Sequence, residues 1–522
     1  MGVVVVRGGV KLLGRYWPVA WVVSTQQSGP GMIMRCNAQD PTKAVRTSVP
    51  DNVLLVDPLA ELTAFRRGLM GCFTRHRDAL FEVADAMLCA QGRVCSPAEL
   101  SLEPELRRGH GSVYAALGRG RIDDAALRRL LVGRLAPARP SEPLMFAIDT
   151  TPLARPDAAY AEDRTMVQVR GKGGDVFLPG WSYSVVVGIG WGTSSWVDPL
   201  QARRLLPTDE HTEVTLAQIR GLLTDLAATD KQAQAAPPPL VILDAGNDAS
   251  ALAHELADEN VQVLTRLNSK RVFYTDPGHR PPGKRGAPRR HGPKLSLSDP
   301  DSGPAPDHEL TALSPRYGTV RVHAWRSMHQ ELGRSGHWAG WPPDTELPIV
   351  RGTVIRVSVE HLPGGRKPLK DLWLFHSAPP GTELDLDLLW KAYLRRFDQE
   401  HFHRFTKVYL GLRAAHLASA AATDRWVQLA IAAYAQLRIA STLTGNLRRP
   451  WHPKPQPGTI SSPYRTRLGF RRLRAQLGSP AKPAKFSRPG PGRPKGSKNR
   501  PKSPRPPHRK TTKPDTNYTQ RR

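Results

Sequence analysis

The sequence predicts an α/β protein in which a mixed β-sheet is covered by helices on both faces. Two short apolar runs, Leu144–Ile148 and Leu240–Leu243, lack polar alternation, as strands do when both of their faces are buried. An amphipathic helix is predicted between them at His211–Ala228, because its leucines and isoleucine recur at helical spacing. A second helix at Ala249–Leu256 precedes another strand at Val261–Leu264. This alternation of strands and helices is typical of such sheets.

More elements are predicted around this pattern. The additional strands are Trp181–Ile189, Trp196–Val197, Gly318–Trp325, Ile349–Val357 and Leu372–Phe375. A long helix is predicted from about Leu384 to Leu412, and another at Asp424–Leu443. The Pro- and Gly-rich residues 274–308 read as a loop. We therefore expect a sheet domain over residues 141–445, with a β-rich insertion at about 266–370.

The first 140 residues divide into two parts. Residues 1–52 show no regular pattern and are expected to form an irregular extension; translation could instead begin at Met32 or Met34. Residues 53–140 are predicted to be helical, since apolar side chains recur at helical spacing. This helical region carries basic runs at Arg107–Arg108 and Arg119–Arg121, which could contact phosphates or simply form a solvated helix face.

The charge of the chain indicates a polyanionic partner. The net charge is +29, and the tail from Arg448 onward holds 22 Lys and Arg residues against the single acid Asp515. Such a composition, rich in Pro and Gly, predicts a disordered basic tail over residues 446–522.

Within this tail, residues 488–498 resemble an AT-hook. An extended Arg-Pro segment fits the narrow minor groove of A·T-rich DNA, so Arg493, Lys495 and Lys498 are candidate DNA contacts. The alternative is a generic basic tail that binds any DNA by counterion release. The Ala-, Arg-, Gly- and Pro-rich composition makes strict A·T targeting unexpected.

The four cysteines and the apolar segments bear on location. None of Cys36, Cys72, Cys89 and Cys95 forms a C-x-x-C pair, which favours a reducing cytoplasm over a disulfide framework. No uninterrupted apolar stretch reaches the roughly 18–20 residues that span a bilayer. A cytoplasmic protein is therefore expected.

Two aspartates occupy matching positions at the ends of predicted strands. Asp149 follows the run MFAI, and Asp244 follows VIL. The exit of a buried strand is where ligands usually bind in α/β folds, so both carboxylates are candidate metal ligands. Asp248 is an alternative ligand to Asp244. Asp149 and Asp244 could each instead merely cap the segment that follows its strand.

A third acid belongs to a stripe on the predicted long helix. Tyr393, Arg396, Glu400 and Lys407 fall within roughly 60° of one another at about 100° per residue. An acid flanked by two cations and a phenol can hold metal and phosphate together, whereas the alternative is a salt-bridged solvated face. A zinc site at His401 and His403 lacks further ligands at metal spacing.

This stripe resembles a known signature. The pattern Tyr-x2-Arg-x3-Glu-x6-Lys is similar to the YREK signature of one branch of the DDE transposases. The segments LFEVADAMLCAQGRV, SLEPELRRGHGSVYAAL, LPGWSYS, DAGND and LRRFDQEHFHRF resemble actinobacterial insertion-sequence transposases, so the resemblance covers about residues 50–500. It implies an RNase H-like domain whose first acid ends the first strand, whose second ends the fourth, and whose glutamate lies on a later helix. Asp149, Asp244 and Glu400 match these places in order.

The resemblance also implies an activity. The three acids would hold two Mg²⁺ or Mn²⁺ ions for strand cleavage and strand transfer by a cut-and-paste route. Tyr393, Arg396 and Lys407 would bind DNA phosphates, and residues 53–140 would be a DNA-binding region. The implied partners are terminal inverted repeats, target DNA and a second copy in a homodimeric synaptic complex, in a bacterial cytoplasm close to the nucleoid.

The sequence leaves three further alternatives open. In this branch an aromatic of the insertion stacks on a flipped base; Trp325 is the candidate here, and core packing is its alternative fate. The chain could also be a catalytically inactive or domesticated DNA-binding protein. A nuclease acting on RNA or hybrid duplexes is a third reading, since this type of sheet serves such enzymes too.

Overall fold

The structure is a computed structural model that forms two compact units, residues 1–56 and 57–522. It describes residues 7–8, 19–20 and 57–507, except for 172–173, 193, 232–235, 280–288, 364–369, 445–450, 452–459, 486–494 and 499–500. In the first unit, β1 (Arg7–Gly8) pairs antiparallel with β2 (Val19–Ala20). The remainder of the predicted N-terminal extension lies outside the described residues.

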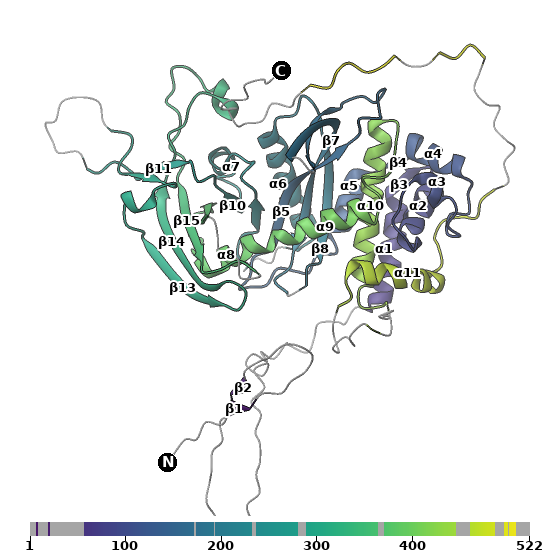
Figure 1. Cartoon of the computed structure of the whole chain (residues 1–522), viewed down its shortest axis with the longest axis horizontal. Helices are drawn as coiled ribbons and strands as arrows, with labels where there is room; N and C mark the ends of the chain where they lie inside the picture. The colour runs from purple at the N-terminus through teal and green to yellow at the C-terminus, as the bar shows by residue number, and fades with distance from the viewer. Residues whose placement is uncertain are drawn as a thin grey trace, which may run out of the picture. The chain divides into compact units, whose positions relative to one another are not determined.

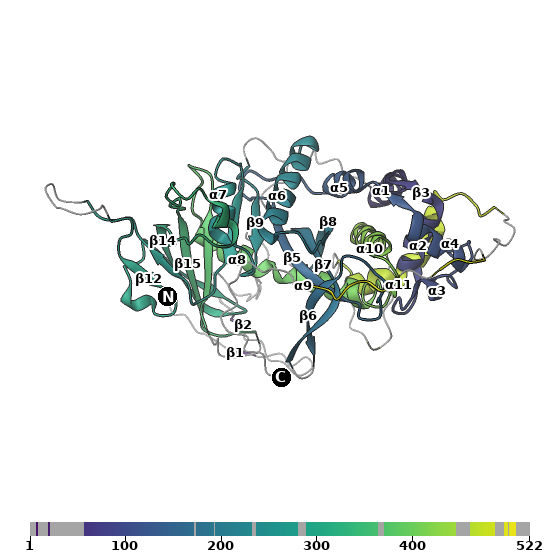
Figure 2. The same ribbon diagram turned by 90° about the horizontal axis from the view of Figure 1, so that it is seen from above.

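A ten-stranded sheet forms the centre of the second unit (Figures 1 and 2). Its central strands are β5 (Met145–Ala154), β7 (Gly174–Ile189), β9 (Leu240–Leu243) and β10 (Gln262–Arg266). β5 is antiparallel to β7 and parallel to β9, which is parallel to β10, so the sheet is mixed. β6 (Thr165–Gly171) and β8 (Val197–Leu205) also pair with β7. The predicted α/β class with a mixed sheet is confirmed.

Helices lie on both sides of β5 and β9. Figure 2 shows α6 (His211–Ala228) on one side and α9 (Phe397–Val408) on the other. The observed bounds of α6 and β9 coincide with the predicted ones, and α7 (Ala249–Glu255) is one residue shorter than predicted. Local hydrophobic periodicity was sufficient here because each element buries a single continuous apolar surface.

The predicted β-rich insertion continues the same sheet. Within the predicted bounds lie the antiparallel strands β13 (His308–Ser314), β14 (Gly318–Met328) and β15 (Gly352–Val359), and β16 (Leu372–Ser377) follows just beyond them. β16 pairs with β10, which joins the insertion to the central strands. The predicted loop contains β12 (Lys294–Ser296), which pairs with β11 (Val272–Tyr274), and the short 3₁₀ helix η1 (Pro300–Ser302).

Trp325 belongs to the core of this insertion and is not available to stack on a base. Its side chain is buried, its indole N–H donates a hydrogen bond of 2.9 Å to the carbonyl of Pro304, and its ring lies 5.8 Å from that of Trp373. The alternative of core packing is therefore the correct one.

The N-terminal helices surround a helix from the C-terminal part of the chain. They are α1 (Pro58–Cys72), α2 (Arg77–Cys89), α3 (Pro97–Leu100), α4 (His110–Arg119) and α5 (Asp124–Val132). The short strands β3 (Phe73–Arg75) and β4 (Arg121–Ile122) form a ladder among them. α1, α2 and α4 pack against α10 (Ala420–Ala440), most of whose residues are buried.

The tail is not disordered throughout, because α11 (Pro463–Leu477) packs on α2 and α10. Phe470 is fully buried, and the Arg467 guanidinium donates to the carbonyls of Met87 at 2.9 Å and Gly92 at 2.7 Å. The prediction of a disordered tail is wrong for this segment. The basic composition of this segment predicts disorder, but it does not show that the arginines of α11 lie opposite buried carbonyls and carboxylates of the N-terminal helices.

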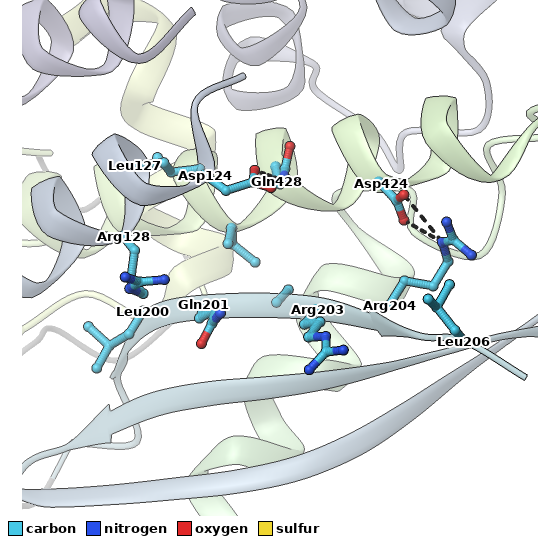
Figure 3. A pocket seen from close by; sticks show the side chains of 12 residues that line it. Asp124, Leu127, Arg128, Leu200, Gln201, Arg203, Arg204, Leu206, Asp424 and Gln428 are labelled. Carbon is cyan, nitrogen blue, oxygen red and sulfur yellow. Dashed lines mark hydrogen bonds and ion pairs between the residues drawn. The ribbon is translucent and has the colours of Figure 1, made fainter. Parts of the chain in front are cut away.

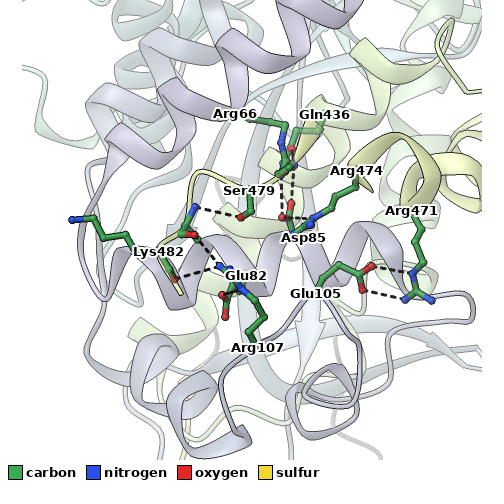
Figure 4. A network of polar contacts seen from close by, with 12 residues as sticks. Arg66, Glu82, Asp85, Glu105, Arg107, Gln436, Arg471, Arg474, Ser479 and Lys482 are labelled. Carbon is green, nitrogen blue, oxygen red and sulfur yellow. Dashed lines mark hydrogen bonds and ion pairs between the residues drawn. The ribbon is translucent and has the colours of Figure 1, made fainter. Parts of the chain in front are cut away.

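Buried ion pairs connect these helices (Figure 4). Asp85 of α2 accepts from Arg66 of α1 at 2.7 Å and from Arg474 of α11 at 3.2 Å. Glu82 of α2 accepts from Arg107 at 2.8 Å and pairs with Arg108 at 2.6 Å. Arg107 and Arg108 therefore have a structural role, and this first basic run is not merely a solvated helix face.

Candidate active site

Asp149 and Asp244 lie at one edge formed by two parallel strands. The pairing of β5 with β9 ends at Ile148 and Leu243, which face each other in register, and each is followed by an aspartate. β5 itself does not end there, since its pairing with β7 continues to Ala154. The predicted strand-end placement thus holds on the β9 side of Asp149 and is wrong on the β7 side.

The predicted long helix is divided at Arg396 into α8 (Leu386–Arg395) and α9. The amide of Arg396 donates to the carbonyl of Tyr393 at 3.2 Å, a bond across three residues that tightens the turn. The prediction of one continuous helix is therefore wrong. The residues of the stripe nevertheless stay close, because Arg396 keeps helical backbone angles.

Arg396 brings two of the predicted acids together. Its side chain is buried, with Nη1 at 3.5 Å from Oδ2 of Asp149 and Nη2 at 3.5 Å from Oε1 of Glu400. Asp244 pairs with Arg266 instead, at 3.8 Å between Nη1 and Oδ1. Arg266, the last residue of β10, was missed by the sequence reasoning. Its only signal was its place on the strand beside β9.

Burial and mutual repulsion perturb the acid at the centre of the site. The pKa of Asp149 rises to about 6, chiefly through burial and further through the charges of Asp244 and Glu400, although Arg396 and the amide of Thr150 oppose the rise. Burial would lower the pKa of Arg396, but the electrostatic effects of Tyr393 and the three acids raise it. The three carboxylates therefore act on one another although they lie on three different elements.

Two further residues of the stripe differ in accessibility. Lys407, in the last turn of α9, has its pKa lowered to about 8 by burial and by Arg413, against the attraction of Asp149. Tyr393 is 1 % exposed and its ring centroid lies 5.9 Å from Cζ of Arg396. Its phenol oxygen is buried, so in this conformation Tyr393 packs beside Arg396, and its direct contact with DNA stays a prediction.

The alternative ligands do not join the three acids. The Asp248 carboxylate caps α7 by accepting from the amides of Ser250 and Ala251, both at 3.1 Å. His403 is buried and its pKa is lowered to about 3, first by burial and then by Lys407 and Arg396, whereas His401 is exposed. Across the described residues, no three or more Asp, Glu, His or Cys side chains are grouped closely enough to hold one metal ion.

Another cavity, of about 340 Å³, lies between α5, β8 and α10 (Figure 3). Its arginines are matched by acids: Arg204 binds Asp424 at 2.9 Å, and Arg128 pairs with Asp225. None of the three predicted acids lines it. Its charges are already compensated within the protein, so it makes a poorer site for a charged substrate.

The tail residues of the AT-hook-like segment are only partly described. Lys495 and Lys498 are exposed, whereas Arg493 lies outside the described residues. Among the helices that the structure describes, none is both long and apolar enough to cross a membrane.

Comparison with known proteins gives one family match. Residues 68–332, half of the chain, match the family model described as DDE superfamily endonuclease. This segment contains Asp149 and Asp244 and ends before Glu400. Among solved structures, the chain is similar to the piggyBac transposase in a cryo-EM structure of its synaptic complex with hairpin DNA. The identity is 10 %, the TM-score is 0.39, and the match covers 82 % of this chain and 83 % of that one. No curated protein sequence matches the chain.

Proposed function

Since the chain belongs to the DDE superfamily endonucleases, we propose that it is a DNA transposase that cleaves and transfers the strands of an insertion sequence by a cut-and-paste route. The observation that carries the proposal is the position of Arg396, which lies 3.5 Å from both Asp149 of β5 and Glu400 of α9 and is also affected by the charge of Asp244, just after β9. The segment that matches the family model contains Asp149 and Asp244, and the ion pair of Arg396 with Glu400 supports adding the third acid.

The order of the strands supports an RNase H-like catalytic domain. β5 is the first strand of this domain in the chain. β6, β7 and β8 follow it and precede β9, and β6 pairs with the first part of β7. The first acid lies on β5, the second directly follows β9, and Glu400 lies on a later helix. The order of the three acids agrees with the transposase resemblance, whereas β9 is the fifth strand counted from β5, one more than that resemblance implies.

The donor set suits Mg²⁺ or Mn²⁺, because all three candidate ligands are carboxylates and hard cations prefer oxygen. The pKa of Asp149 is raised chiefly by burial and further by the charges of Asp244 and Glu400, so a bound cation would stabilise its charged form. Asp149, Asp244 and Glu400 would hold the ions. When bound, such ions activate a water or 3′-hydroxyl and stabilise the leaving oxygen of a phosphodiester.

The cations of the stripe have roles of their own. The Arg396 guanidinium pairs with both Asp149 and Glu400, and the buried ring of Tyr393 packs against the same guanidinium. Lys407 lies close enough to Asp149 for their charges to interact, so it would bind a phosphate beside the acids. The DNA partners would be terminal inverted repeats and target DNA, joined by a homodimer.

The decisive experiment is Mg²⁺-dependent cleavage of DNA that carries the sequences flanking this gene. Wild type should cut at the element ends, whereas Asp149→Ala, Asp244→Ala and Glu400→Ala should not. Asp344→Ala, which removes an exposed acid of the insertion, serves as the matched control and should cut normally. If the three variants cleave as wild type does, the proposal is wrong.

A non-catalytic DNA-binding protein is the second candidate. It is favoured by the position of Arg396, whose guanidinium already stands against two of the acids, and by the lack of a three-ligand metal group among the described residues. Specific binding of DNA without cleavage, at sites unrelated to terminal repeats, would select this candidate.

A further inference from the structure

The ladder of β3 and β4 sets two arginines opposite each other. Arg75 and Arg121 are partners in this antiparallel pair, and both are exposed. Like charges placed directly across a ladder are destabilising. Gly120 brings the chain tightly from α4 into β4, since a Cβ there would lie 2.3 Å from the carbonyl oxygen of Ala116. The fold therefore holds the two guanidinium-bearing strands together despite their repulsion.

Further cations converge on the same place. His76, between β3 and α2, has its pKa lowered by burial and then by the charges of Arg119, Arg75 and Arg425, which come from three different elements. Arg119 is exposed in the last turn of α4. Arg425 donates to the carbonyls of Leu117 and Ala421. Positive charge is thus concentrated around His76.

The acids of this neighbourhood are engaged elsewhere. Asp123 caps α5 by accepting from the amide of Ala126, and Asp124 accepts from the side chain of Gln428. Asp78 accepts from the amide of Lys482 and faces Arg108 at 3.8 Å. Within the part of the chain that the structure describes, no carboxylate pairs with Arg75, Arg119 or Arg121.

The other basic run of this region provides the contrast. Arg107 and Arg108 both bind the buried Glu82 and also donate to carbonyls of residues 481–483. They hold the tail segment in place and have their charge compensated within the protein. Of the two basic runs, the one at Arg119 and Arg121, together with Arg75 across the ladder, is exposed and has no acidic partner among the described residues.

We propose that Arg75, Arg119 and Arg121 form a surface that binds the phosphate backbone of duplex DNA. The proposal rests on the proposed function and specifies where the N-terminal helical region contacts its partner. A guanidinium binds phosphate through two parallel hydrogen bonds, and adjacent phosphates would relieve the repulsion across the ladder. Such contacts set the position of the protein on DNA and carry no sequence information.

The test is the salt dependence of duplex binding by the full chain without divalent ions, so that cleavage plays no part. The slope of log K against log salt is negative, and each phosphate that the protein neutralises adds about 0.9 to its magnitude. Arg75→Gln combined with Arg121→Gln should therefore reduce the magnitude of the slope by roughly 1.8. The double variant should also weaken binding of unrelated duplex sequences equally. The melting temperature should not fall, because neither side chain has an acidic partner among the described residues.

The control is Arg139→Gln combined with Arg220→Gln. These two exposed arginines already pair with Glu142 and Glu259, so the slope should stay at its wild-type value. An unchanged slope in the ladder variant, or an equal fall in the control, would overturn the inference while leaving the cleavage proposal standing. Absence of duplex binding by the wild type would overturn this inference together with the proposed function.

Discussion

Two buried arginines of this protein have opposite surroundings. Arg66, 2 % exposed, binds both carboxylate oxygens of Asp85 at 2.7 and 3.0 Å and reaches Gln436 at 2.8 Å. Arg396, 4 % exposed, stands 3.5 Å from each of its two acids, and its Nε has no hydrogen-bond partner among the described residues.

The difference separates a structural ion pair from a candidate active site. A buried charge in water-free surroundings is costly unless its hydrogen bonds are complete, as they are around Asp85. Incomplete contacts among several like-charged acids leave electrostatic free energy that a ligand can recover, which is why perturbed groups gather at functional sites. Four predictions test this contrast, from the largest expected effect to the smallest.

Asp149→Asn should reduce cleavage by about a thousandfold or more. The amide keeps the shape of the side chain and removes the charge that would hold a metal ion, which is worth several kcal/mol in the transition state. Single-turnover cleavage measures the effect, and circular dichroism confirms that the fold is kept. Near-normal cleavage would remove Asp149 from the site.

Asp85→Ala should destabilise the protein by about 3–5 kcal/mol, because it leaves Arg66 buried without its partner. Arg474 loses a partner at the same time. Denaturant unfolding measures the loss. At temperatures where the variant is folded, cleavage should persist, and a large fall in the rate of the folded variant would contradict the structural role of this pair.

Asp149→Asn should also stabilise the protein at neutral pH, by about 1–3 kcal/mol. Asp149 has a raised pKa of about 6 in the fold against its ordinary value of 3.8. The folded state therefore holds a proton that the unfolded state releases, and wild-type stability is lost as pH rises toward 6. The advantage of the variant should grow from about pH 4 to 6 and then stay level. Added Mg²⁺ should reduce the stability difference between the variant and the wild type, because it binds only the wild type.

Between pH 7 and 9 the wild type should lose roughly fivefold in DNA affinity, about 1 kcal/mol, and Lys407→Arg should remove this loss. The pKa of Lys407 is lowered to about 8, so the wild type loses this positive charge as pH rises through 8. The arginine variant keeps its charge and should bind equally at pH 7 and 9. Parallel pH profiles for the two proteins would show that Lys407 does not face DNA.

The sequence predicts the elements whose signal is local and does not predict those that depend on distant residues. α6 and β9 were predicted with their observed bounds, since each has its own periodicity or apolar run. β13 was missed because it is a largely exposed edge strand without a clear apolar face. α11 was missed because its arginines bind Glu105 and Asp85, which lie 366 and 389 residues earlier in the chain.

The sequence by itself determined the order of the three candidate acids and the spacing that places Glu400 one helical turn from Arg396. Only the tertiary structure decided that Arg396 interrupts the helix and meets Asp149, that Tyr393 is buried, and that Arg75 faces Arg121. The physical reason is that spacing along a helix is a local property of the backbone. Strand register, burial and the meeting of distant charges depend on how the elements pack.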